Sequence, residues 1–161
     1  MPELLWSEVE DLFDPALMGA LPDLRIPDTS VEDWQAVLDV VVADGWPYEY
    51  SEGLDSRPLP RAETILARPA DAESPQLRVS PFPDAVAIFR FHAEIEIDFD
   101  VDLRELQGQE RLDAFCAFLG RLGRRLGKAV FMDAEGDHGH PVLGFDPEAD
   151  RVRTLVDPRA G

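Results

Sequence analysis

Acidic side chains at alternate positions between residues 94 and 102 are the first group in this sequence that could carry chemistry. They are Glu94, Glu96, Asp98, Asp100 and Asp102. Because successive side chains of a strand point to opposite faces, this spacing places all five on one face of a strand. Like charges so close together repel one another. The face is therefore solvated and partly neutralised by basic neighbours, or it binds a basic partner.

Three of these carboxylates also resemble the start of a calcium-binding loop. Asp98, Asp100 and Asp102 have the spacing of the first three ligands of an EF-hand. The sixth position should be glycine and is Leu103, and the twelfth should be glutamate and is Gln109. The sequence therefore excludes an EF-hand at this place.

The segment Asp133–His140 is the second candidate. It supplies ligand types suited to zinc, manganese or iron, namely Asp133, Glu135, Asp137, His138 and His140. Its glycines, at positions 136 and 139, indicate a tight turn, which favours an exposed loop between two strands. The alternative is a small divalent-metal-dependent enzyme, in which His138 and His140 bind the metal and Glu135 acts as the base.

No other motif predicts catalysis. The single cysteine, Cys116, belongs to the apolar stripe of a predicted helix and is expected in the core. No G-x-S-x-G nucleophile motif occurs. We therefore assign no catalytic residue and no cofactor, and we favour a non-catalytic protein that binds a basic partner through the five carboxylates.

Length and composition limit the classes of protein to consider. The chain has 161 residues, which predicts a single domain over residues 1–161. Its 33 acidic and 15 basic side chains give a net charge of −18, which disfavours nucleic acid as a partner. One cysteine excludes a framework of disulfides within the chain. The oligomeric state stays open.

Hydrophobic segments are too short for a membrane protein, and the first 13 residues include four acids and no basic residue, unlike a signal peptide. We therefore expect a cytoplasmic protein that does not bind membranes.

Two long helices are predicted, over residues 30–44 and 109–126. The first begins at a capping box formed by Thr29 and Glu32. The second has a stripe of leucine and aromatic side chains and ends at Gly127. Its internal glycines, Gly120 and Gly123, predict close packing of this helix on a sheet. A shorter helical pattern covers residues 2–14.

Five strands are predicted, over residues 77–80, 85–101, 129–133, 141–145 and 152–156. Period-two alternation is clear in the second of these. The long strand should bend or bulge near residues 91–94, because a straight strand of this length would exceed a small domain. Its apolar face should include Ala93, Ile95, Ile97 and Phe99. We expect the last three of these to pack on the helix over 109–126, against Phe115, Leu119 and Leu122.

The sequence thus predicts an α+β fold, with an antiparallel sheet of about five strands and two main helices on one face. The chain resembles a family of small acidic α+β proteins from actinobacteria to which no activity is attached. The resemblance rests on residues 29–50, 95–127 and 144–150. The architecture also resembles that of toxin-immunity proteins, which implies a protein-binding role of an immunity or regulatory type.

Overall fold

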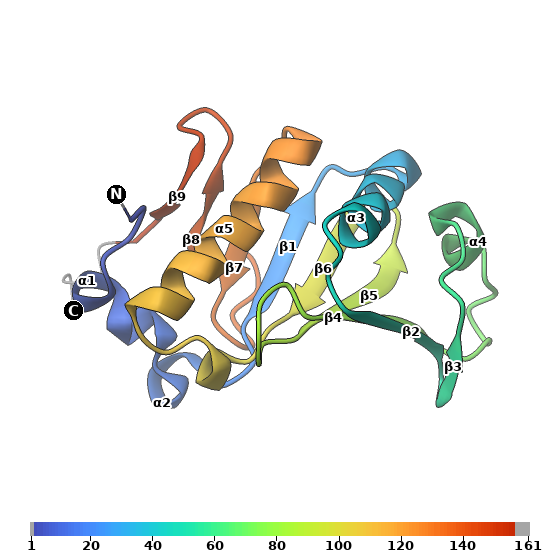
Figure 1. Ribbon diagram of the computed structural model, residues 1–161, viewed down its shortest axis with the longest axis horizontal. Coiled ribbons are helices and arrows are strands. Elements are labelled where there is room, and N and C mark those ends of the chain that lie inside the picture. Colours follow the sequence, from blue (N-terminus) through green and yellow to red (C-terminus); the bar gives the residue numbers. More distant parts are fainter. Residues whose placement is uncertain (1, 157–161) are drawn as a thin grey trace.

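A single antiparallel sheet of nine strands forms the centre of the computed structural model, which describes residues 2–156 (Figure 1). The strand order is β3-β2-β4-β5-β6-β1-β7-β8-β9. The strands are β1 (Asp23–Pro27), β2 (Tyr48–Glu52), β3 (Asp55–Arg57), β4 (Pro75–Val79), β5 (Ala87–Ala93), β6 (Glu96–Asp100), β7 (Val130–Asp133), β8 (Pro141–Asp146) and β9 (Arg151–Thr154). The predicted antiparallel sheet is confirmed, but the predicted number of strands was too low.

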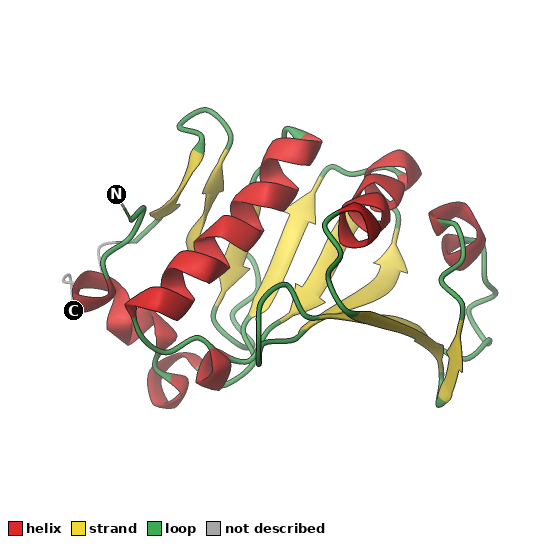
Figure 2. Ribbon diagram, in the orientation of Figure 1, coloured by secondary structure: helices red, strands yellow, loops and turns green. Residues whose placement is uncertain are grey.

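Two long helices, α3 (Val31–Ala43) and α5 (Gln109–Leu126), lie over the same face of the sheet (Figure 2). The shorter helices are α1 (Trp6–Val9), η1 (Glu10–Phe13), α2 (Pro15–Met18), α4 (Ala62–Leu66) and η2 (Leu103–Glu105). The single helix predicted over residues 2–14 is therefore divided between α1 and η1, and its predicted end at Asp14 is confirmed. Asp14 is the N-cap of α2 and accepts a hydrogen bond from the Ala16 backbone, so the chain starts a new helix at Pro15.

Helix α5 has the predicted bounds, and its apolar stripe is buried. Phe115, Leu119 and Leu122 are each at most 1% exposed. Gly123 lies so close to Phe145 of β8 that a Cβ atom there would clash with the phenyl ring, which confirms close packing on the sheet. At Gly120 the nearest atoms belong to Arg124 of the same helix, so the prediction fails there.

Helix α3 starts one residue later than the predicted capping box. Ser30 and Asp33 form the box, in which the Ser30 hydroxyl accepts from the Asp33 backbone and the Asp33 carboxylate accepts from the Ser30 backbone. Thr29 is left free to bind elsewhere, and it is buried.

The region predicted as one long strand over residues 85–101 is a hairpin. The predicted irregularity is present as a register shift between Arg90 and Ala93, but the chain then reverses at Glu94 and Ile95. Thr29 donates from its hydroxyl to the Glu94 carbonyl and from its backbone to the Ile95 carbonyl. The Trp34 indole donates to the Ala93 carbonyl. Contacts from α3 and the residue preceding its cap thus hold this turn.

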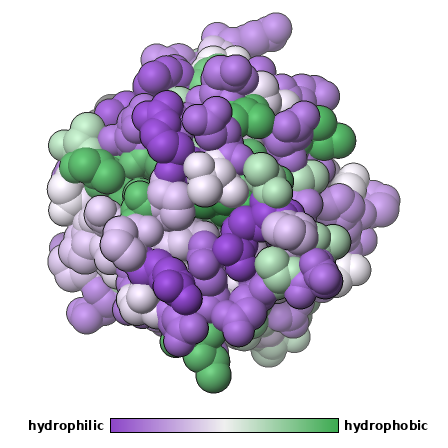
Figure 3. Space-filling model, turned by 90° about the vertical axis from the view of Figure 1, so that its right-hand side faces the viewer, coloured by the Kyte–Doolittle hydropathy of each residue, from purple (hydrophilic) through white to green (hydrophobic). Residues whose placement is uncertain are grey.

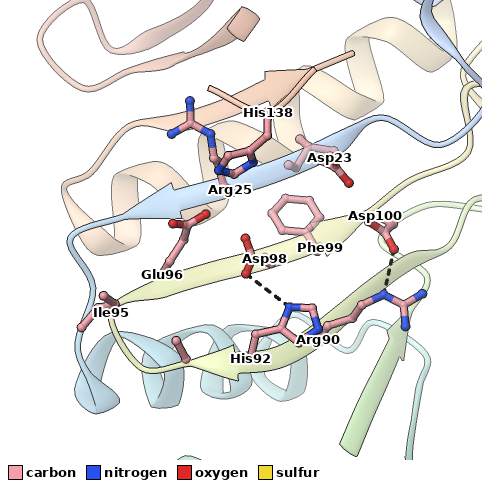
Figure 4. Close-up of a pocket in the computed structure, with 12 residues that line it drawn as sticks. Asp23, Arg25, Arg90, His92, Ile95, Glu96, Asp98, Phe99, Asp100 and His138 are labelled. Carbon is pink, nitrogen blue, oxygen red and sulfur yellow. Dashed lines mark hydrogen bonds and ion pairs between the residues drawn. The ribbon is translucent and has the colours of Figure 1, made fainter. Parts of the chain in front are cut away.

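The two faces of the sheet differ in what covers them. The face under α3 and α5 carries the core, including Ile97 and Phe99. Ile95 was expected there, but it lies at the hairpin turn and is 67% exposed. On the opposite face, strands β5, β6 and β1 lie in front of the long helices when viewed from that side (Figure 4). We call this the open face.

The sheet ends at two short strands. At one end, β3 has three exposed residues. At the other, the backbone N–H of Val152 in β9 donates to the carboxylate of Glu3. The end that carries β3 and α4 has a mostly hydrophilic surface, on which hydrophobic areas are small and separate (Figure 3).

Candidate functional site

A groove of about 430 Å³ crosses the centre of the open face (Figure 4). Its lining comes from strands β1, β5 and β6, from the β5–β6 turn and from the loop between β7 and β8. The polar lining residues are Asp23, Arg25, Arg90, His92, Glu96, Asp98, Asp100 and His138. The apolar ones include Ile95, which lies at one end of the groove (Figure 4), and Ala93, the last residue of β5.

Strand register explains why these charges meet. In the β1–β6 pair, Asp23 lies opposite Asp100 and Arg25 lies opposite Asp98. In the β5–β6 pair, Arg90 also lies opposite Asp98. Residues directly opposite each other in antiparallel strands point to the same face. The sheet therefore gathers acids that are far apart in the sequence.

The two arginines of the groove are each engaged by one carboxylate. Arg90 Nε lies 2.8 Å from Asp100 Oδ2, and Arg25 Nε lies 2.9 Å from Asp133 Oδ2. No arginine or lysine within residues 2–156 forms an ion pair with the other three carboxylates, which are Asp23, Glu96 and Asp98. The nearest basic group to Asp98 is the imidazole of His92, whose Nδ1 atom lies 3.6 Å from Asp98 Oδ2. The groove thus holds negative charge that its arginines do not neutralise.

Proton binding reflects this excess of acids. The pKa of Asp98 is raised to about 7 by burial, by a hydrogen bond with Glu96 and by the charges of Glu96, Asp23 and Asp100. The pKa of Asp23 is also raised, mainly by burial and then by the charge of Asp100. A cation in the groove would reverse these shifts, because it favours the ionised carboxylates.

Beside the groove, Asp133 anchors the loop over residues 134–140. Its side chain is fully buried, and Oδ2 accepts hydrogen bonds from Arg25 and from the Gly139 backbone. The His138 Nδ1 atom lies 3.8 Å from the same oxygen, and the ring points over the groove (Figure 4). Asp133 Oδ1 has no hydrogen-bond partner among the described residues. This carboxylate therefore positions both Arg25 and the loop.

The structure brings three of the five predicted binding residues together. Glu96, Asp98 and Asp100 line the groove. Glu94 belongs to the turn and is exposed, so it does not extend the row of acids. Asp102 follows β6, caps η2 and binds Arg104, which lowers its pKa. The prediction of one continuous five-residue face is wrong because β6 contains only residues 96–100.

The candidate metal ligands in 133–140 do not converge. His140 binds Asp137 at 3.0 Å, His138 faces Asp133, and Glu135 packs against Gly19. Within residues 2–156, no group of three or more His, Cys, Asp or Glu side chains is arranged to hold a metal ion. Cys116 is buried as expected, and burial raises the pKa of its thiol to about 12.

Several groove residues were not predicted from the sequence to belong to the site. Asp23 and Arg25 belong to β1, a central strand that was not predicted. A signal was present, because Leu24 and Ile26 alternate with polar residues over Asp23–Pro27. The five-residue length and the terminal proline made this pattern inconspicuous.

The basic residues at the C-terminal end of α5 do not pair with the carboxylates of the groove. Arg121 binds Asp44, Arg124 binds Asp150, and Lys128 lies near Asp33. These pairs lie on elements of the covered side, so they leave the groove unchanged.

No family model, no curated protein and no solved structure matches the chain. Of the helices in residues 2–156, none has the length and apolar character needed to cross a membrane.

Proposed function

We propose that this protein is a non-catalytic binding module that docks a basic segment of a partner protein on its open face. The observation that carries the proposal is the groove itself, which lies on a sheet face that α3 and α5 do not cover. Three of its carboxylates, Asp23, Glu96 and Asp98, are not paired with an arginine or lysine of residues 2–156.

Charge complementarity is what such a groove offers a partner. Arginine and lysine side chains of a partner can pair with the carboxylates that have no such partner within residues 2–156. A guanidinium group binds a carboxylate with two parallel hydrogen bonds. Complementary charges also accelerate association and exclude acidic competitors. A role of an immunity or regulatory type, in which this protein holds a basic partner, is consistent with this chemistry.

The test is titration of the purified full-length chain into a labelled peptide, Ser-Ser-Arg-Ser-Arg-Ser-Ser, with blocked termini at pH 8. We expect binding that weakens steeply between about 20 and 150 mM salt, because exposed charges are screened within about 8–10 Å. Glu96→Lys combined with Asp98→Lys should weaken binding about ten-fold or more.

The matched control is Glu63→Lys combined with Asp71→Lys, which makes the same change in net charge. Both residues are exposed, and neither lines the groove. This control should bind the peptide within about two-fold of wild type, since only long-range attraction changes. Equal losses in the two double variants, with both proteins folded by circular dichroism, would contradict the proposal.

A further inference from the structure

We infer that the partner segment is extended and amphipathic, with basic side chains among Asp23, Glu96 and Asp98 and an apolar side chain on Ala93 and Ile95. The inference rests on the proposed function and names the chemistry of the partner.

The first observation is the exposure of Ile95. It is a large β-branched hydrophobic residue, it is 67% exposed, and it lies at one end of the groove (Figure 4). The exposed Ala93, which ends β5 two residues earlier, lines the same groove. A single exposed hydrophobic residue is ordinary on a protein surface. Here, however, Ala93 and Ile95 line the same groove as Asp23, Glu96 and Asp98, which have no arginine or lysine partner in residues 2–156. This combination fits a partner that is apolar at one end and basic in the middle.

The second observation is that the turn carrying Ile95 is held in place. The carbonyls of Ala93, Glu94 and Ile95 all accept hydrogen bonds from Trp34 or Thr29, at distances of 2.7 to 3.0 Å. The apolar contact therefore needs little ordering when a partner binds, and a preorganised surface loses less entropy on association.

The spacing of the acids selects an extended partner. Glu96, Asp98 and Asp100 are two residues apart on one strand, so their repeat is about 7 Å. An extended peptide presents alternate side chains at the same repeat. Two basic residues of the peptide that are separated by one residue can thus face Glu96 and Asp98. An apolar residue two positions further along the peptide then lies at the end of the groove that carries Ile95.

A second copy of this chain is a poor occupant. Its net charge is −18, and a symmetric dimer through this face would bring two copies of the same acidic groove together. A basic segment of another protein has the complementary charge.

The experiment compares two peptides that differ only in their ends. Leu-Ser-Arg-Ser-Arg-Ser-Leu carries an apolar residue at both ends, so it serves either orientation in the groove. Ser-Ser-Arg-Ser-Arg-Ser-Ser has the same charge without them. We expect the leucine peptide to bind about five-fold or more tightly than the serine peptide to the wild-type chain at pH 8.

Ile95→Ser should remove this difference without changing the affinity for the serine peptide. The matched control is Leu54→Ser, because Leu54 is a fully exposed hydrophobic residue in the turn of the β2–β3 hairpin and does not line the groove. This control should keep the preference for leucine.

Each failure has a distinct meaning. If the two peptides bind equally to wild type, or if Ile95→Ser weakens both alike, the inference is overturned while the acidic groove keeps its proposed role. If neither peptide binds, the proposed function fails and the inference with it. If sedimentation shows a dimer that Ile95→Ser dissociates, the apolar end is covered by a second copy, which also overturns the inference.

Discussion

The two faces of strand β6 have different surroundings, because one packs in the core and the other lines the groove. On the covered face, Ile97 and Phe99 are buried in the core beneath the long helices, and the Phe99 ring lies 4.7 Å from that of Phe89 and 5.7 Å from that of Phe118. On the open face, Glu96 and Asp98 lie among other acids, and burial together with the neighbouring negative charges raises the pKa of Asp98. The chain's own helices bury the apolar side chains of the covered face, whereas the open face carries negative charge that a partner could neutralise.

This comparison separates stability from recognition. Substitutions under α3 and α5 should act on the free energy of unfolding, because they remove packing. Substitutions in the groove should act mainly on binding, because its carboxylates are only partly buried and contribute less to folding than packed core side chains. The following predictions test this division, and the expected effect decreases from one to the next.

The largest loss of stability is expected from the covered face. Leu119→Ala should lower the free energy of unfolding by about 2–5 kcal/mol, since Leu119 is fully buried in the core. Val42→Ala, on the exposed side of α3, should cost less than about 0.5 kcal/mol. Urea denaturation measures both, and a loss below about 1 kcal/mol for Leu119→Ala would show that this helix face is not part of the core.

Asp133 is expected to be an exception on the open face, because it is buried there. Asp133→Asn removes the negative charge that forms the ion pair with Arg25 and should lower the free energy of unfolding by about 1.5–3 kcal/mol. Hydrogen exchange of the Gly139 amide, which donates to Asp133, should also become faster. Unchanged stability together with unchanged exchange would mean that this carboxylate does not hold the loop.

The pH dependence of stability should identify Asp98. The pKa of Asp98 is about 7 in the folded chain, whereas the ordinary value for an aspartate is 3.8. The folded state therefore binds a proton at this carboxylate more tightly than the unfolded state does. The resulting stabilisation is complete below about pH 4 and is lost as the pH rises through 7.

Asp98→Asn, which stays neutral, should therefore be more stable than wild type at pH 8 by about 1 kcal/mol, a value reduced by solvent screening. The difference should shrink toward pH 5. Thermal denaturation of the two proteins at both pH values provides the measurement, and a constant difference in Tm would argue against a raised pKa.

The smallest effect is expected where the chain neutralises its own surface charges. Arg121 binds Asp44 through Nε and Nη2 at 2.8 and 3.1 Å, and both groups are exposed to solvent. Asp44→Asn should change the free energy of unfolding by less than about 0.5 kcal/mol. Peptide binding should be the same as for wild type, and a marked loss of binding would show that the groove is not the only acidic surface involved.

Helix α5 could be predicted from the sequence because every local signal agreed. Its apolar stripe has helical spacing, and Gly127 adopts the left-handed conformation that ends the helix. The β5–β6 hairpin could not be predicted in the same way. Glu94 and Ile95 are not turn-forming residues, and neither has a positive φ. Long-range hydrogen bonds from Thr29 and Trp34 hold the turn instead, so the sequence showed uninterrupted alternation.

The candidate site was predicted only in its β6 part. Alternation identified Glu96, Asp98 and Asp100, because spacing along one strand is visible in the sequence. Asp23 and Arg25 join them through β1, which lies between β6 and β7. The order of strands in a sheet depends on long-range pairing, and a local pattern carries no information about it.

The way the sheet ends has a consequence for solubility. Exposed edge strands can pair with further chains and polymerise into fibrils. The β3 edge is only three residues long and carries Asp55 and Arg57, and on β9 the amide of Val152 is occupied by Glu3. Within residues 2–156, these two edge strands have only three and four residues, and both carry charged side chains. We therefore expect these short, charged edges to resist pairing with further chains into cross-β aggregates.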